Sequence, residues 1–350
     1  MSAPPIVSGP RAGRDDTDGD EGEPLVRALR RRLLGSSLLY LCSTLAVLFV
    51  GFSIAAPNAF LTAYNIRTVV TVASVLLVVS VGSTFVIATA GIDLSVGSVL
   101  VISGVTAIKA MEAVGGQGAG TVLVGLLAAL LSGLAWGTVN GLVVARLKVP
   151  ALIATLGSMG AALGIAELIT GGSDLNGVPT TLFRTIGLGR LLGVVPWIVV
   201  IAVAITAGAG LLLTRTRFGL HTLFIGSNPE ASRRAGIDVT RHLTKVYALA
   251  GTLAGLAGFL DLALYASANI AGHNSDNLQA VTAVVLGGTS LFGGTASVLG
   301  TVIGVFIPAV LQNGFVIVKV QTFWQEVVIG TVLVAAVYLD QLKRSARERA

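Results

Sequence analysis

Long stretches without a charged side chain run through this sequence from residue 36 to residue 340. These 305 residues contain only 23 Asp, Glu, Lys or Arg, about one in thirteen. Soluble domains carry about 25% charged residues, against 11% in this chain, and its mean hydropathy is +0.87. Such a chain cannot cover a globular surface with polar groups. The pattern argues against a soluble enzyme, a disordered protein and a nucleic-acid binder, and predicts an all-α integral membrane protein.

The two ends of the chain have a different composition from its centre. Residues 1–35 hold 12 charged residues, with an acidic run over 15–23 followed by arginines over 27–32. This is not a secretory signal, so we expect a disordered cytoplasmic tail before a retained first helix. Residues 341–350 form a second, basic tail, which leaves 36–340 as the transmembrane domain. Cys42 is the single cysteine, which excludes an intrachain disulfide and a CxxC metal site.

The number of membrane spans follows from the length of the charge-free runs, because about 20 apolar residues cross a bilayer as a helix. The runs are 36–66, 68–92, 94–108, 113–145, 149–166, 191–214, 246–260, 262–275 and 277–318. A last span is expected over about 324–339. With glycine-rich breaks near Gly91 and Gly288, we predict about ten spans.

The basic residues predict the orientation of these spans. With the N-terminus inside and ten alternating helices, 16 Lys or Arg fall near the cytoplasmic face and 5 near the outer face. This asymmetry is the positive-inside pattern. Both termini are therefore expected in the cytoplasm, and the net charge of +6 requires no acidic partner.

Glycine has two different meanings in this chain. Gly133, Gly137 and Gly141 are spaced four residues apart, which predicts close packing of two helices in lipid. The segments 90–100 and 287–295 instead interrupt apolar runs, and Gly91 aligns with Gly288 in a short internal repeat. Glycine-interrupted helices at matching places in two halves indicate a translocation path. We therefore expect two pseudo-repeated halves with broken or re-entrant segments.

Embedded carboxylates are costly in a bilayer and raise functional hypotheses. Asp93 lies beside the first break, where it is expected to cap the following helix through the backbone N–H of Ser95 or Val96. A direct role in the pathway and an interface pairing remain open for it. Glu167 and Asp261 lie near helix ends, where pairing or snorkelling is more plausible than contact with a solute. The three histidines are scattered in sequence and support no metal site.

Residues 214–246 are the largest internal polar segment. Asn228 suits an N-cap, Pro229 the first helical position and Glu230 the first turn. Arg233 and Arg234 then fall in the last turn, followed by Gly236 as a C′ stop and by Thr240 as the expected cap of the next membrane helix. A short, well-capped helix on a cytoplasmic loop predicts a docking element; a helix lying along the lipid headgroups is the alternative. The chain has no Walker A pattern and no HExxH motif.

At these motifs the sequence resembles the ribose-type permease subunits of bacterial ABC importers, which carry monosaccharides and related polyols. The resemblance is carried in order by 90–98 (AGIDLSVGS), 226–237 (GSNPEASRRAGI), 283–294 (AVVLGGTSLFGG) and 324–330 (WQEVVIG), with 150–157 and Asn140-Gly141 between them. It extends over roughly residues 60–340. The family usually has Glu-Leu before the third motif, whereas this chain has Asn277-Leu278.

The resemblance implies a permease without cofactor or enzymatic activity of its own, paired with a second permease subunit in a homo- or heterodimer. ATP would be bound by cytoplasmic ATPase subunits, and an extracytoplasmic solute-binding protein would deliver the sugar. The implied substrate pathway comprises Asp93, Ser95, Gly97, Ser98, Asn140, Gly288, Thr289 and Ser290. The implied ATPase-coupling residues are Asn228, Pro229, Glu230, Ala231, Arg233, Arg234 and Gly236.

Other functions remain open from the sequence. A branched-chain amino acid or nucleoside permease of the same machinery would share the glycine-rich breaks. An ion-coupled secondary transporter could use Asp93, Glu167 and Asp261 as ion sites. A membrane-embedded enzyme would need clustered His, Asp or Glu near one face, and the sequence displays no such cluster.

Overall fold

A computed structural model of the chain describes residues 37–321, except 271 and 274, and scattered residues between 323 and 338. The expected tails over 1–35 and 341–350 lie outside the described residues. The long helices are α2 (Ser37–Ala55), α4 (Ala63–Ala88), α5 (Val96–Val114), α6 (Ala119–Ala145), α7 (Ala151–Thr170), α9 (Trp197–Arg215), α12 (Val239–Tyr265) and α14 (Val298–Ile317). Shorter helices are α3 (Pro57–Phe60), α8 (Thr180–Leu182), the π-helix η1 (Phe183–Gly187), α10 (Arg217–Ser227), α11 (Pro229–Arg234) and α13 (Asp276–Leu286). Two minimal antiparallel sheets join β1 (Leu175–Asn176) to β4 (Ser267–Ala268) and β2 (Arg190–Leu191) to β3 (Val195–Pro196).

Seven helices within the described residues are long and apolar enough to cross a membrane: α4, α5, α6, α7, α9, α12 and α14. The all-α membrane class is confirmed, but the expected number of about ten spans is not. The difference arises because several charge-free runs do not fold as one span each. The run 277–318 contains α13, which has 11 residues, and one full-length helix, α14. Helix α2 contributes a shorter apolar segment, Leu41–Ala55.

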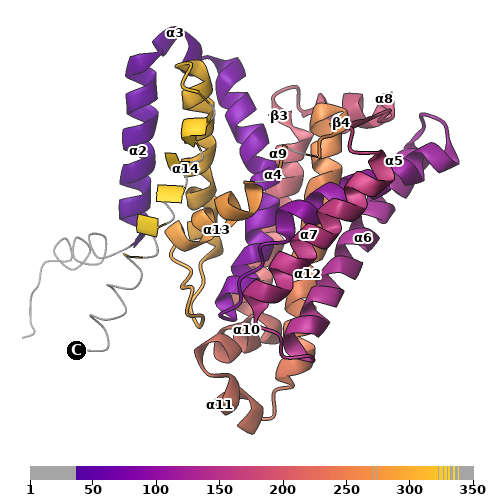
Figure 1. Cartoon of the computed structure of the whole chain (residues 1–350). Coiled ribbons are helices and arrows are strands. Elements are labelled where there is room, and N and C mark those ends of the chain that lie inside the picture. Colours follow the sequence, from indigo (N-terminus) through magenta and orange to yellow (C-terminus); the bar gives the residue numbers. More distant parts are fainter. Residues whose placement is uncertain are drawn as a thin grey trace, which may run out of the picture.

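Helix α12 lies at the centre of the bundle and packs against α4, α5 and α6 (Figure 1). Its contact with α6 is made almost entirely by small residues. Gly133 and Gly137 of α6 face Gly251 and Gly255 of α12 so closely that a Cβ added at any of the four would meet backbone atoms of the other helix. The predicted glycine seam is therefore present, and the two helices approach at backbone distance.

Helices α4 and α14 are joined by buried polar pairs. Asn65 and Asn313 exchange side-chain hydrogen bonds of 3.0 and 2.9 Å, and the hydroxyls of Thr84 and Thr301 lie 2.9 Å apart. Polar side chains that hydrogen-bond across helices fix their register in an apolar surrounding. The outer faces are apolar: Leu123, Leu127 and Leu131 form an exposed stripe along α6, as expected of a helix facing lipid or a second membrane subunit.

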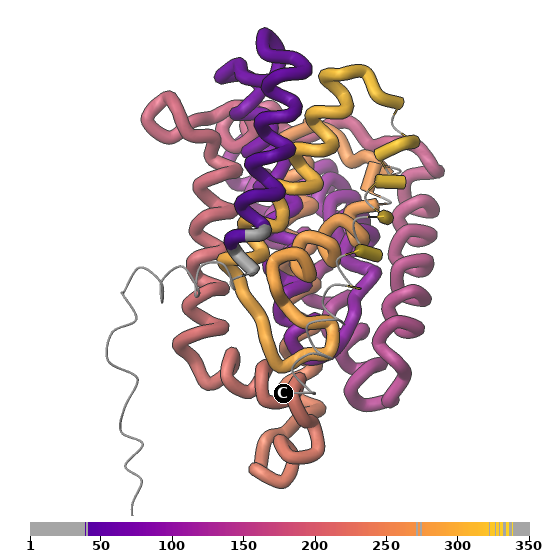
Figure 2. The backbone as a smooth tube through the Cα atoms, turned by 90° about the vertical axis from the view of Figure 1, so that its left-hand side faces the viewer, coloured from indigo at the N-terminus to yellow at the C-terminus, as the bar shows by residue number. Residues whose placement is uncertain are grey.

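Both glycine-rich segments interrupt helices, as the sequence predicts. Residues 89–95 separate α4 from α5, and residues 287–297 separate α13 from α14. Figure 1 shows α13 as a short tilted helix at mid-height, with the loop before α14 descending toward α10 and α11. Helix α11 projects beyond the ends of the long helices in both views (Figures 1 and 2).

Candidate functional site

Helix α11 is built as the sequence predicts. The side-chain oxygen of Asn228 accepts a 2.9 Å hydrogen bond from the backbone N–H of Ala231, and Pro229 occupies the first helical position. Gly236 follows with φ of +84°, a left-handed conformation that ends the helix. These local signals define a six-residue helix with fixed ends.

The expected cap of the following helix is wrong. The carboxylate of Asp238, not the hydroxyl of Thr240, caps α12 by accepting a 2.9 Å bond from the N–H of Arg241. Asp and Thr are both good N-caps. Thr240 instead lies inside the first turn, where its carbonyl accepts a hydrogen bond from the side chain of Thr244.

The surface of α11 is polar and accessible. Glu230 pairs with Arg233 and Arg234 at 3.4 Å, and all three side chains are more than half exposed. Exposed pairs of this kind contribute little to stability. Ser232 is buried on the opposite face, and its hydroxyl donates to the carbonyl of Asn228 at 2.9 Å. The helix is therefore held from one side and presents charged groups on the other.

The segment leading into α11 touches both broken segments. Gly226, near the end of α10, packs so closely that a Cβ would meet the carbonyl oxygen of Ala88 and lie 2.6 Å from the amide nitrogen of Gly294. The N–H of Gly294 donates a 3.0 Å hydrogen bond to the carbonyl of Ala88. Gly293 and Gly294 have φ of +78° and +81°, which favours glycine at both positions. We call this contact between Ala88, Gly226 and Gly293–Gly294 the glycine junction.

The first broken segment is fixed by buried hydrogen bonds. Asp93, only 3% exposed, accepts bonds from the backbone N–H of Ser95 at 2.9 Å and from its hydroxyl at 2.6 Å. The amide of Asn140, from α6, donates to the Ser95 hydroxyl at 2.8 Å. Thr155, from α7, bonds to the backbone of Ile92 and Leu94 at 3.2 Å each. Asp93 therefore bonds the backbone at the start of α5, in agreement with its expected capping contact.

Helix α13 contacts the same segment from the second half of the chain. The amide of Asn277 donates a 3.1 Å bond to the carbonyl of Leu94, and a Cβ at Gly97 would approach the carbonyl of His273 and the amide of Asn277. The position at which this chain differs from the usual Glu-Leu pair thus joins one broken segment to the other half.

The second broken segment is closed by its own hydrogen bonds. Gly288 has φ of +88°, and the hydroxyl of Thr289 accepts a 3.2 Å bond from the N–H of Ser297. The N–H of Ser290 donates to the carbonyl of Thr295 at 3.2 Å. Thr289 is buried and Ser290 half-buried.

The expected pathway residues therefore divide into connected groups. Asp93, Ser95 and Asn140 form one hydrogen-bonded chain, and Gly97 and Ser98 follow it, buried, in the first turn of α5. Gly288, Thr289 and Ser290 lie in the second break, with Gly288 exposed. The two groups lie in the segments that the glycine junction and Asn277 hold together.

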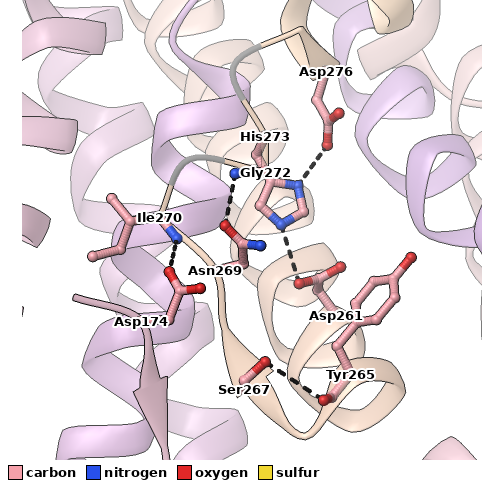
Figure 3. A network of polar contacts seen from close by, with 9 residues as sticks. All are labelled: Asp174, Asp261, Tyr265, Ser267, Asn269, Ile270, Gly272, His273 and Asp276. Carbon is pink, nitrogen blue, oxygen red and sulfur yellow. Dashed lines mark hydrogen bonds and ion pairs between the residues drawn. The ribbon is translucent and has the colours of Figure 1, made fainter. Parts of the chain in front are cut away.

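Sequence reasoning missed one cluster entirely. Asp261, expected to pair near a helix end, does pair, and its partner is His273, which also contacts Asp276 (Figure 3). The three residues are 12 and 3 positions apart along the chain. The signal was the isolation of these two carboxylates, since Asp261 and Asp276 bound the charge-free run 262–275.

Comparison with known proteins places these features among membrane permeases. The profile of the family described as "Branched-chain amino acid transport system / permease component" matches residues 65–337. The ribose import permease protein RbsC of Escherichia coli K12 is 38% identical over 305 residues, 86% of this chain and 92% of that protein. RbsC of Bacillus subtilis is 38% identical over 85% and 91% of the two chains, and the D-allose permease protein AlsC of Escherichia coli K12 is 34% identical over 85% and 90%. No solved structure matches the chain.

Proposed function

Because this chain belongs to the family of branched-chain amino acid transport system permease components, we propose that it is the membrane-spanning subunit of an ABC importer for a monosaccharide or related polyol. The observation that carries the sugar assignment is that similar permeases named for ribose, allose, arabinose and fructose are 30–38% identical over most of the chain. The chain would supply the passage, while ATP hydrolysis belongs to a partner subunit.

Charge supports an orientation with α11 in the cytoplasm. Among the described residues, eight Lys or Arg lie at or near the α11 end: Arg146, Lys148, Arg215, Arg217, Arg233, Arg234, Arg241 and Lys245. Five lie toward the opposite end: Arg67, Lys109, Arg184, Arg190 and Lys319. Basic residues favour the cytoplasmic side. With this orientation α2 begins inside, which agrees with a cytoplasmic N-terminus.

The proposed ATPase contact is the exposed face of α11, with Asn228, Pro229, Glu230, Ala231, Arg233, Arg234 and Gly236. Its charged side chains are free to exchange their weak mutual pairs for partners on a second protein. Ser232 and the α10 connection hold the helix to the transmembrane bundle. A displacement of α11 by the ATPase would therefore be transmitted rather than absorbed locally.

The glycine junction gives that displacement a path. Gly226 contacts Ala88, which ends α4, and Gly294, in the break before α14. Because these contacts are between backbones, no side-chain rotation can take up a shift of α10. We propose that movement of α10–α11 rearranges both broken segments and alternates access to a pathway shaped with a second permease subunit.

The pathway is proposed to run along the segments holding Ser95, Ser98, Thr289 and Ser290, whose hydroxyls and neighbouring backbone groups suit a neutral polyol. A solute-binding protein on the outer side would deliver the sugar and set most of the specificity. The passage itself then needs only weak contacts. Irregular backbone at membrane depth is tolerated where it is buried in protein or lines a cavity.

The test is uptake by proteoliposomes containing this chain with its ATPase and solute-binding protein. ATP-dependent uptake of ribose, allose, arabinose or fructose is expected. Uptake of leucine or a nucleoside in place of all four sugars would support the amino acid or nucleoside alternative. Concentrative uptake by this chain without an ATPase, driven by an ion gradient, would overturn the importer assignment.

A further inference from the structure

A small polar cavity lies among α4, α12, α13 and α14, in a bundle that is otherwise strongly apolar. Its volume is about 100 Å³, whereas one water needs only about 10–15 Å³ by the same kind of measure. Its polar lining consists of Asp261, Tyr265, His273, Asp276, Gln279 and Gln312. The space therefore accommodates several waters or the hydroxyl-bearing edge of a sugar.

His273 holds the two carboxylates of this cavity in place (Figure 3). Its Nδ1 lies 2.7 Å from Asp276 Oδ2 at the start of α13, and its Nε2 lies 3.1 Å from Asp261 Oδ2 near the end of α12. The loop that carries His273 is anchored independently, because Asp174 accepts a 3.0 Å bond from the N–H of Ile270. The arrangement is rigid and does not depend on a ligand.

The clamp leaves hydrogen-bonding capacity unused. Asp261 and Gln279 are each only 4% exposed, and both line the cavity. Asp261 Oδ1 and Gln279 Oε1 have no hydrogen-bond partner within the described part of the chain; the Gln279 amide nitrogen donates to Ser275 at 3.1 Å. Buried acceptors without partners are costly unless water or a ligand satisfies them. The cavity thus presents preformed acceptors and, through the amides, donors.

The charge of the cluster suits hydroxyl groups. Burial lowers the pKa of His273, but its hydrogen bonds to Asp261 and Asp276 outweigh this and raise it to about 10. The imidazole is then cationic at neutral pH and balances one of the two carboxylates. An acceptor-rich site of low net charge binds polyol hydroxyls through charge-assisted hydrogen bonds without requiring a cationic solute.

We propose that the cavity lined by Asp261, Tyr265, His273, Asp276, Gln279 and Gln312 is a hydroxyl-binding subsite for the transported sugar. The inference rests on the proposed function. The carboxylate oxygens not used by His273 accept sugar hydroxyl protons, and the two glutamine amides contact neighbouring hydroxyls. Asp261 and Tyr265 lie near the end of α12 that is farthest from α11. With α11 in the cytoplasm, the sugar meets this subsite before the broken segments.

Substitutions that spare the clamp separate binding from structure. Gln279→Leu and Gln312→Leu remove an amide from α13 and α14 while Asp261, His273 and Asp276 stay. Thr282→Val is the matched control, because Thr282 is a buried polar residue of α13 whose hydroxyl bonds only to its own helix, at Leu278. Each variant is reconstituted with its ATPase and binding protein, and tested with whichever of ribose, allose, arabinose or fructose the unmodified complex transports.

Each glutamine variant is expected to lose about tenfold in sugar uptake, the effect of one unmade hydrogen bond, while the loaded binding protein still stimulates ATP hydrolysis as in the control. Uptake within twofold of the control in both variants overturns the subsite. Parallel loss of uptake and ATPase stimulation overturns it as well, since that result indicates a structural role. Failure of the unmodified complex to transport any of the four sugars would instead refute the proposed function.

Discussion

Replacing Gly137 by alanine should separate the two most closely packed helices of the bundle. A Cβ at this position would meet the carbonyl oxygen of Tyr247 and would lie 3.0 Å from the Cα atoms of Ala248 and Gly251. All of these are backbone atoms of α12, so no side chain can rotate away. The helices must move apart instead.

The size of the effect follows from that geometry. Carbon atoms prefer about 3.5–4.0 Å, so α6 must retreat by about 0.5–1 Å, which forfeits about a quarter to a half of the attraction at each affected contact. Overpacking of this kind costs about 1–3 kcal/mol. The better helix propensity of alanine returns up to about 1 kcal/mol. We expect a net loss of about 1–2 kcal/mol, because Gly133 and Gly141 lie in the same seam and are loosened together.

The assay is heating of the purified protein in detergent followed by size-exclusion chromatography, with the temperature of half-loss as the readout. Gly160→Ala on α7 is the matched control, since a Cβ at that helical glycine has no heavy atom within 4 Å. We expect Gly137→Ala to lower the temperature of half-loss by at least about 2 °C and Gly160→Ala to leave it unchanged or raised. Equal temperatures for the two variants would refute the seam as a determinant of stability.

Three further outcomes are expected. Glu230→Ala and Arg233→Ala should abolish coupling, leaving inserted protein with little ATPase stimulation and little uptake; wild-type values in both assays would contradict the docking role of α11. Gly226→Ala should uncouple ATP hydrolysis from uptake by opening the glycine junction, whereas Gly208→Ala, which has open space around its Cβ, should not. Because the pKa of His273 is raised from 6.5 to about 10, its stabilising contribution should be complete below pH 6.5 and lost as the pH rises through 10. Thermal unfolding in detergent should reveal this decline in the unmodified protein but not in His273→Gln, and identical pH profiles would count against the clamp.

Several features followed directly from the sequence. The scarcity of charge over residues 36–340 determined the membrane class, because a bilayer excludes unpaired ions. The motifs 90–98, 226–237 and 283–294 indicated the ribose-type branch, which the similarity to ribose and allose permeases confirms. The caps of α11 were readable because a capping bond joins residues only three positions apart.

Other features were decided only by tertiary structure. Charge-free runs predicted about ten spans, but hydropathy does not distinguish a full span from a short helix such as α13 ending inside the protein. Asp261 and His273 looked unrelated because the contact depends on how the loop after α12 folds back. The glycine junction joins residues 88, 226 and 294, which no local pattern connects. Sequence determined which segments are apolar, broken or capped, since those properties are local; the partners of each segment depend on packing between helices, which only the folded chain specifies.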